Sequence, residues 1–194
     1  MTILQIYFDF KSPESYLAFH QTQKIALPDS VQIEWKPFLT KYKKIPIAKN
    51  NETKSETHAR IREEHKKFIN LKYSKLLNIP MKYPDNDIQT DLALSITSSC
   101  GIAAEQYISL AFSYYWQKNQ NLNSFEVLES LLAKTSLPIT ILENSDSLID
   151  ALKKETAVAK EQGIIATPTY QIEEEIFLGR EHLPWIQKTV EGHS

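Results

Sequence analysis

The residues with the clearest chemical potential form the run Ser12-Pro13-Glu14-Ser15. They follow residues 6–10, an apolar and aromatic stretch whose composition predicts a buried strand. Ser12 is a favoured helix N-cap, and Pro13 suits the first helical position. Glu14 places negative charge in the first turn, where the helix dipole favours it. We therefore predict that a strand runs into a turn at Ser12 and that the turn opens a helix.

This turn brings the Ser12 hydroxyl close to the first N–H groups of the helix, which have no partner within the helix. Together they attract an anion, and a thiolate is an anion. The alternative is that Ser12 is only a helix cap. The turn by itself leaves both interpretations open.

The elements around this turn follow from periodicity and from helix breakers. The first helix is predicted to run from Pro13 to about Ala26, where Leu27-Pro28-Asp29-Ser30 interrupts it. Residues 31–35 alternate apolar and polar side chains, as a half-buried strand does, and Pro37 ends that strand. The crossover is long enough to join two parallel strands.

Residues 55–140 have helical periodicity and no strand pattern, so we predict a helical block there. Ser124 is expected to cap one helix of this region, and Asp146 the helix that follows the block, which Gly163 would end. The apolar positions that share helix faces are Ile61, Phe68, Ile69 and Leu76; Ile88, Leu92 and Ile96; Tyr107, Leu110, Ala111, Tyr114 and Tyr115; Leu128, Leu131 and Leu132; and Ile149, Leu152, Thr156 and Ala159.

The C-terminal part returns to strand periodicity. Residues 167–172 and 175–178 are predicted strands joined by a turn, and residues 183–190 a final helix. The order is therefore βαβ, a helical block, then αββα. Without the block this is the thioredoxin arrangement, an α/β fold with helices on both faces of a mixed sheet. We expect residues 1–40 plus 143–194 to form the thioredoxin-like domain and residues 41–142 an inserted helical domain.

The run from Phe8 to Ala18 resembles the start of kappa-class glutathione transferases and of the related 2-hydroxychromene-2-carboxylate isomerases. Both belong to the DsbA-like branch of the thioredoxin fold. In redox members of that branch a Cys-x-x-Cys occupies this turn, whereas this chain has Ser12 and Ser15. The two serines argue against a thiol–disulfide oxidoreductase.

The resemblance extends to the C-terminal part of the chain. The segment from Gly163 to Thr169 resembles the one that carries a cis-proline opposite the active-site turn. This implies a cis Thr167–Pro168 bond next to Ser12, with the backbone of Thr167 presented to a peptide. The alternative is an ordinary trans-proline at a strand start.

Residues 177–183 resemble the family segment Phe-Gly-x-Asp-Arg, which binds the γ-glutamyl end of glutathione. Glu181 stands where Asp is usual and His182 where Arg is usual. Asn51 lies where these families often supply a polar ligand. The glutathione-binding residues implied by the resemblance are Ser12, Pro13, Asn51, Thr167, Pro168, Arg180 and Glu181.

The resemblance implies a glutathione-dependent isomerase or transferase. Ser12 would donate a hydrogen bond to the glutathione sulfur and lower its pKa, and the thiolate would add to an electrophilic aromatic or unsaturated substrate. Aromatic residues such as Tyr107, Tyr114 or Trp116 are candidates to line the substrate site, and the lysine-rich residues 41–54 to attract an acidic ligand. The competing hypothesis is a degenerate, non-catalytic DsbA-like module that binds peptides.

Composition narrows the remaining choices. The 194 residues are 42% apolar, enough for a packed core, and the net charge of −2 argues against nucleic acid as a partner. Neither a membrane span nor a signal peptide is evident, and the single cysteine, Cys100, fits a reducing compartment, so we expect a cytoplasmic protein. His58 and His65 are too far apart to predict a zinc site. Homodimers are usual for the families that the chain resembles.

Overall fold

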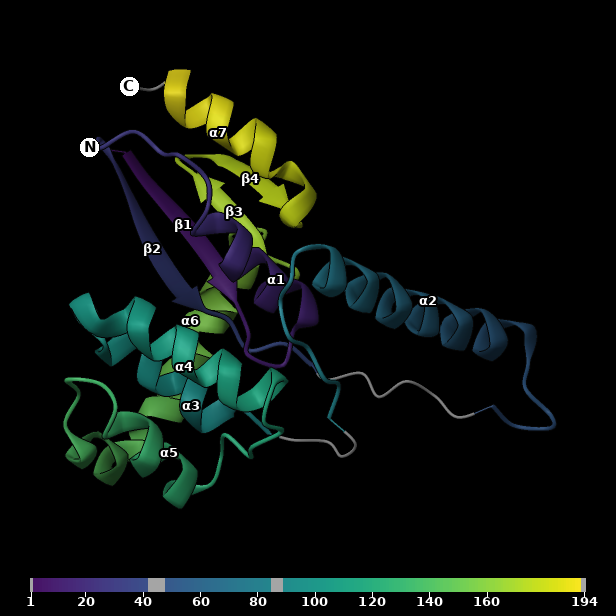
Figure 1. The fold of residues 1–194 in the computed structure, drawn as a ribbon, viewed down its shortest axis with the longest axis horizontal. Helices are drawn as coiled ribbons and strands as arrows, with labels where there is room; N and C mark the ends of the chain where they lie inside the picture. The colour runs from purple at the N-terminus through teal and green to yellow at the C-terminus, as the bar shows by residue number, and fades with distance from the viewer. Residues whose placement is uncertain (1, 42–47, 85–88, 193–194) are drawn as a thin grey trace.

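A four-stranded mixed sheet forms the centre of the molecule, with the strand order β2-β1-β3-β4 (Figure 1). The computed structural model describes residues 2–41, 48–84 and 89–192. β1 pairs with β2 in parallel and with β3 antiparallel, and β3 pairs antiparallel with β4. The strands are β1 (Thr2–Phe8), β2 (Val31–Pro37), β3 (Thr169–Ile172) and β4 (Glu175–Leu178).

The helices have the predicted order, so the expected thioredoxin-like fold with a helical insertion is confirmed. Among the described residues of the 55–132 segment there is no strand. The helices are α1 (Pro13–Thr22), α2 (Lys54–Leu76), α3 (Asp91–Ile96), α4 (Ala104–Trp116), α5 (Phe125–Leu132), α6 (Ser145–Glu161) and α7 (Leu183–Gly192).

Two predicted helix boundaries were wrong. α1 ends at Thr22 rather than near Ala26, because the next residues make tighter bonds three residues back, such as Lys24 N–H to the Gln21 carbonyl at 3.0 Å. Asp146 does not cap α6, which begins at Ser145 directly after a 3-10 helix over Ile139–Asn144. Since one helix leads into the next, no extended capping residue separates them.

Helices cover both faces of the sheet, as predicted. On one face the side chains of Leu4 and Ile6 pack with Ala18 of α1 and with α7, whose buried residues are Leu183, Ile186 and Val190. On the other face Tyr7 packs with Ala159 of α6. Gly163 has φ +96°, a conformation that suits glycine, and it ends α6 as expected.

The insertion shares a hydrophobic core with the β1–α1 layer. Phe8 and Phe10 at the end of β1, together with Tyr16 of α1, contact Phe112 of α4 at ring-centroid distances of 5.9, 5.0 and 5.5 Å. The indole N–H of Trp116 donates to the Phe10 carbonyl at 2.9 Å. The turn before α1 therefore packs against α4, a buried helix of the insertion.

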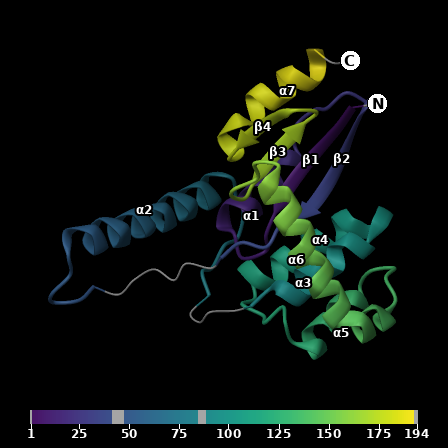
Figure 2. The same ribbon diagram turned by 180° about the vertical axis from the view of Figure 1, so that it is seen from behind.

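α2 departs from the rest of the insertion because it projects away from the body of the molecule (Figures 1 and 2). Its predicted apolar face is largely in solvent: Ile61, Phe68 and Leu76 are 51%, 62% and 67% exposed. The buried residues of α2 are instead the polar Asn70 and Ser74. Across the described residues, no helix combines the length and the apolar character that crossing a membrane requires.

Candidate functional site

Ser12 occupies the N-cap of α1 and makes two hydrogen bonds. Its Oγ accepts from the Ser15 N–H at 3.1 Å and donates to the Thr167 carbonyl oxygen at 3.3 Å. The Thr167–Pro168 peptide bond is cis. Both the cis bond and its contact with Ser12 were predicted and are confirmed. The two segments that meet here lie 155 residues apart in the chain.

The sheet brings these segments together. β3 pairs antiparallel with β1 so that Thr169 lies opposite Tyr7, which places the start of β3 beside the end of β1. α1 begins just beyond that end of β1. Strand pairing therefore positions the Thr167 backbone against the Ser12 turn.

A buried carboxylate, Asp9, anchors the residues before Ser12. Asp9 is fully buried, and its Oδ2 accepts from the Thr40 N–H at 2.8 Å and the Thr40 hydroxyl at 2.7 Å. Its Oδ1 accepts from the Lys11 N–H and the Thr90 hydroxyl at 3.1 and 3.2 Å. The buried Lys11 ammonium lies 3.5 Å from Asp9 and 3.3 Å from Asp91. This anchor joins the Ser12 turn to the chain after β2 and to the start of α3.

Our sequence interpretation missed this anchor, although one signal was available. Asp9 is a charged residue within the apolar and aromatic run of residues 6–10. A carboxylate predicted to be buried needs several hydrogen-bond donors. Its presence therefore indicates a polar network, but it does not identify the partners Thr40 and Thr90.

A hollow of about 530 Å³ opens beside the turn; we call it the Ser12 hollow. Its lining is partly aromatic and strongly basic, with five lysines and two glutamates among the described lining residues. Lys67 lies over the Tyr83 ring at 5.0 Å and Lys160 over the Phe38 ring at 5.6 Å. The lining also includes Ser12, Pro13, Glu14, Lys66, Trp116 and Thr167.

A second hollow of about 880 Å³ lies between α1, α2 and the C-terminal segment; we call it the tail hollow. Pro168, Arg180 and Glu181 belong to its lining. Four residues line both hollows: Glu14, Asn70, Ala166 and Thr167. The two hollows therefore adjoin at these four residues, next to Ser12, and we call the two together the groove.

The charged residues of the tail hollow are held in place. Arg180 donates through Nη1 to the Gln21 side chain at 3.0 Å, and its guanidinium lies 4.1 Å from the centre of the Tyr73 ring. The Glu181 carboxylate folds against Gly179, where an added Cβ would lie 2.5 Å from its oxygens. Gly179 has φ +95°, so both its conformation and its close contact favour glycine.

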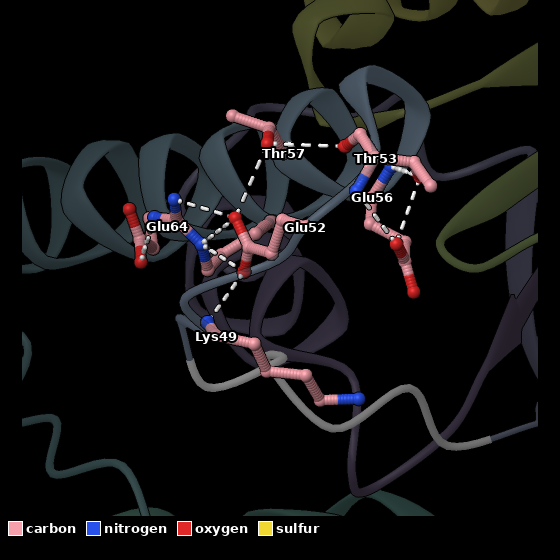
Figure 3. Close-up of polar contacts among 7 residues, drawn as sticks. Lys49, Glu52, Thr53, Glu56, Thr57 and Glu64 are labelled. Carbon is pink, nitrogen blue, oxygen red and sulfur yellow. Dashed lines mark hydrogen bonds and ion pairs between the residues drawn. The ribbon is translucent and has the colours of Figure 1, made fainter.

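Asn51 is not brought to the groove. It is exposed and lies in a turn between Lys49 and Glu52, just before the start of α2. Figure 3 shows Lys49 and Glu52 on either side of this turn. That end of α2 is the one remote from α1 (Figure 1). The long α2 carries this turn outward, which the residue type alone does not reveal. Lys43 and Lys44 of the predicted basic segment fall outside the described residues, whereas Lys41 lines the Ser12 hollow.

Of the three aromatic residues proposed to line the substrate site, one lines the Ser12 hollow and two do not. Trp116 lines the Ser12 hollow, while Tyr107 is fully buried and donates its hydroxyl to the Ala93 carbonyl at 2.7 Å. Tyr114 accepts a hydrogen bond from Lys134 at 2.6 Å and does not line the hollow. Tyr83 lines it but was not predicted, since it follows the breaker Pro80 and belongs to no helical pattern.

The pKa values of Glu14, in the turn, and of Cys100, elsewhere in the core, are both perturbed. Burial raises the pKa of Glu14, while Lys66 and the Asn70 amide act in the opposite direction. Burial also raises the pKa of the Cys100 thiol to about 12, and Cys100 does not line the groove. Cys100 thus has the character of a small buried apolar residue, as predicted.

Comparison with known proteins shows the family to which the chain belongs. Two curated relatives, the 2-hydroxychromene-2-carboxylate isomerases of Pseudomonas sp. (strain C18) and Pseudomonas putida, are each 24% identical to the chain. The matches cover 99% of the chain and 92% of the first relative, and 93% and 90% for the second. A solved 2-hydroxychromene-2-carboxylate isomerase shares the fold with a TM-score of 0.76 at 19% identity, over 97% of this chain and 94% of that one. Residues 3–191 match the DsbA-like thioredoxin domain, and the chain therefore belongs to that family.

Proposed function

We propose that this protein is a glutathione-dependent enzyme of the 2-hydroxychromene-2-carboxylate isomerase type. The observation that carries the proposal is the position of Ser12. Its hydroxyl lies 3.3 Å from the Thr167 carbonyl, at the place where the two hollows meet. The relatives named as isomerases match nearly the whole chain, which supports the reaction class.

The residues of the groove fit glutathione in their order. An extended peptide beside Thr167 and Pro168 would place its γ-glutamyl end toward Arg180 and Glu181 and its cysteine toward Ser12. The Glu181 carboxylate suits an ammonium group, and Arg180 suits a carboxylate. Bound glutathione would supply a thiolate nucleophile to the Ser12 hollow.

Ser12 itself can serve both as cap and as hydrogen-bond donor. Its Oγ can still accept the hydrogen bond from the Ser15 N–H when glutathione is bound. At the same time its hydroxyl hydrogen can turn from the Thr167 carbonyl toward the sulfur anion. The bond being exchanged is 3.3 Å long and therefore weak. A charge-assisted bond in its place lowers the pKa of the thiol.

The lining of the Ser12 hollow suits an anionic, planar substrate. Lys67 and Lys160 lie over aromatic rings, and among the described residues neither has a carboxylate within ion-pair distance. Trp116 adds a further aromatic surface. We propose an unsaturated aromatic acid as the substrate, with transfer of glutathione to an electrophile as the alternative outcome of the same chemistry.

The test measures the pKa of bound glutathione from its thiolate absorbance. A charge-assisted hydrogen bond contributes about 1.5–3 kcal/mol, so Ser12→Ala should raise this pKa by about one to two units. Thr53→Ala, which removes a helix cap outside the groove, is the control and should leave this pKa unchanged. If Ser12→Ala titrates like wild type, Ser12 is a cap only and the catalytic role fails.

A non-catalytic peptide-binding role is the competing hypothesis, because the groove beside Thr167 suits a peptide whether or not its thiol reacts. Glutathione would then raise the melting temperature of the protein, but binding would leave the pKa of the glutathione thiol unchanged. Isomerisation of 2-hydroxychromene-2-carboxylate, measured with and without glutathione, separates the two hypotheses directly.

A further inference from the structure

The carboxyl group of Glu14 has no role in the function proposed above, yet it occupies a central position. It is the second residue of α1, two residues after Ser12. Of the four described residues that line both hollows, Glu14 alone is ionisable. A substrate bound in the Ser12 hollow would therefore share that hollow with Glu14.

The groups facing Glu14 come from two other elements. α2 contributes Lys66 and the Asn70 amide, and the C-terminal segment contributes Arg180 and Glu181. Lys66 is already paired with Glu63 at 3.2 Å, and Arg180 donates to Gln21 at 3.0 Å. Because both cations are shared with other acceptors, they compensate the burial of Glu14 incompletely, and the carboxyl group retains its proton to a higher pH than an exposed glutamate.

We infer that Glu14 is the acid–base group of the reaction, donating a proton to the carbonyl oxygen of an unsaturated substrate and later removing it. This inference rests on the proposed function. A carboxyl group at the junction of the groove can reach the substrate while Ser12 is occupied with the sulfur.

The proton and electron balance is closed. Bound glutathione supplies the thiolate that adds to the carbon β to the carbonyl group and later departs. As that carbon–sulfur bond forms, the electron pair of the carbon–carbon double bond shifts into the bond between the α carbon and the carbonyl carbon. The π pair of the carbonyl group moves onto its oxygen, which takes the proton of the Glu14 carboxylic acid. After rotation about the resulting single bond, the Glu14 carboxylate removes the same proton, the double bond reforms and the carbon–sulfur bond breaks. No oxidant or reductant is required.

Glu63 is the other carboxylate of the Ser12 hollow, but it is paired with Lys66 at 3.2 Å and does not line the tail hollow. The ammonium groups of the lysines in the hollow suit binding of the substrate anion. Glu14 is thus the carboxyl group whose position, in the lining of both hollows, suits proton donation.

Two electrophiles test the inference, because only one of them needs a proton donor. Addition of glutathione to trans-4-phenyl-3-buten-2-one forms an enolate, whereas displacement of chloride from 1-chloro-2,4-dinitrobenzene takes up no proton. Glu14→Gln should lower kcat for the enone by about 100-fold and change chloride displacement by less than about twofold. Glu14→Asp should retain part of the enone activity.

The matched control is Glu126→Gln. Glu126 is also the second residue of its helix, after the N-cap Ser124, but it is exposed and lies outside both hollows. It therefore reproduces the loss of a first-turn carboxylate without altering the groove. Its enone activity should equal that of wild type.

A second measurement does not depend on activity. Since the pKa of Glu14 is raised in the folded state, the unfolded state loses this proton first as the pH rises. Above the ordinary value of 4.5, wild type should lose stability relative to Glu14→Gln in urea unfolding followed across pH. The difference between wild type and Glu126→Gln sets the baseline.

The outcomes are distinct. Equal loss of both reactions in Glu14→Gln would mean that Glu14 binds the peptide ammonium, and loss of neither that it only lines the groove; each result overturns the inference. A stability difference that does not change with pH also overturns it. If wild type binds glutathione but catalyses neither reaction, the proposed function fails, and the inference fails with it.

Discussion

Two helices of this protein begin in the same way but with opposite consequences. The N-cap of α2 is Thr53. Its Oγ accepts the Glu56 N–H at 3.2 Å, while the Glu56 carboxylate accepts the Thr53 N–H at 2.9 Å (Figure 3). Glu52 bonds to Arg60 at 2.9 Å and to Thr57 at 3.2 Å. Among the described residues every partner lies within eight residues, so these bonds form without the rest of the fold.

The polar groups at the start of α1, in contrast, do not all find partners nearby in the sequence. Ser12 donates to a carbonyl 155 residues away, and Pro13 has no N–H to offer. The Ser15 hydroxyl is buried and has no hydrogen-bond partner in the described structure. Glu14 faces the groove rather than a neighbouring donor on its own helix. The comparison teaches that a helix cap becomes a candidate site when its polar groups depend on distant segments.

Removal of the anchor beneath the α1 turn should have the largest effect. Asp9→Ala leaves the buried Lys11 ammonium with Asp91 alone and removes the acceptor of Thr40 and Thr90. Breaking a buried ion pair by removing one partner costs about 3–5 kcal/mol. Urea unfolding of Asp9→Ala and Thr53→Ala should therefore give clearly different losses. Similar losses would show that the two helix starts are equally local.

Ser12→Ala and Thr53→Ala should match in stability and differ in function. Each removes a helix cap, with a cost of about 1 kcal/mol in the free energy of unfolding. Only Ser12→Ala should weaken glutathione binding, measured by calorimetry. Equal affinity in both variants would remove the functional distinction between the two caps.

Ser15→Ala should stabilise the protein, because the hydroxyl is buried without a partner. Relief of that desolvation cost and the higher helix propensity of alanine should together add up to about 1 kcal/mol. The thermal midpoint of the variant reports the sign. A decrease would mean that the hydroxyl has a bound partner, and the α1 turn would then be as complete as that of α2.

The smallest effect is expected at Cys100, which lies outside both helix starts. Because burial raises its pKa to about 12, iodoacetamide should not label the native protein at pH 8 but should label it in urea. The unfolded thiol ionises first, so stability should fall as the pH rises above the ordinary value of 9.0. Labelling of the native protein would mean that the Cys100 thiol is accessible and reactive in the folded state.

Local rules account for most of what the sequence alone determined. Capping by Ser12, the proline at the first helical position and the positive φ of Gly163 and Gly179 depend only on neighbouring residues, so the element order could be predicted. The predicted and observed elements differed most at their boundaries, such as the end of α1 at Thr22. There an α-helical turn and a tighter 3-10 turn differ little in free energy.

The tertiary structure alone decided which residues meet. The donors to Asp9, the junction of the two hollows at Glu14 and the remoteness of Asn51 depend on strand pairing and on the direction of α2. The exposed apolar face of α2 shows the same limit, since its spacing predicts a helix but not what the helix packs against. Residue types set local conformation within a few residues, whereas burial and long-range contacts arise only when the whole chain packs.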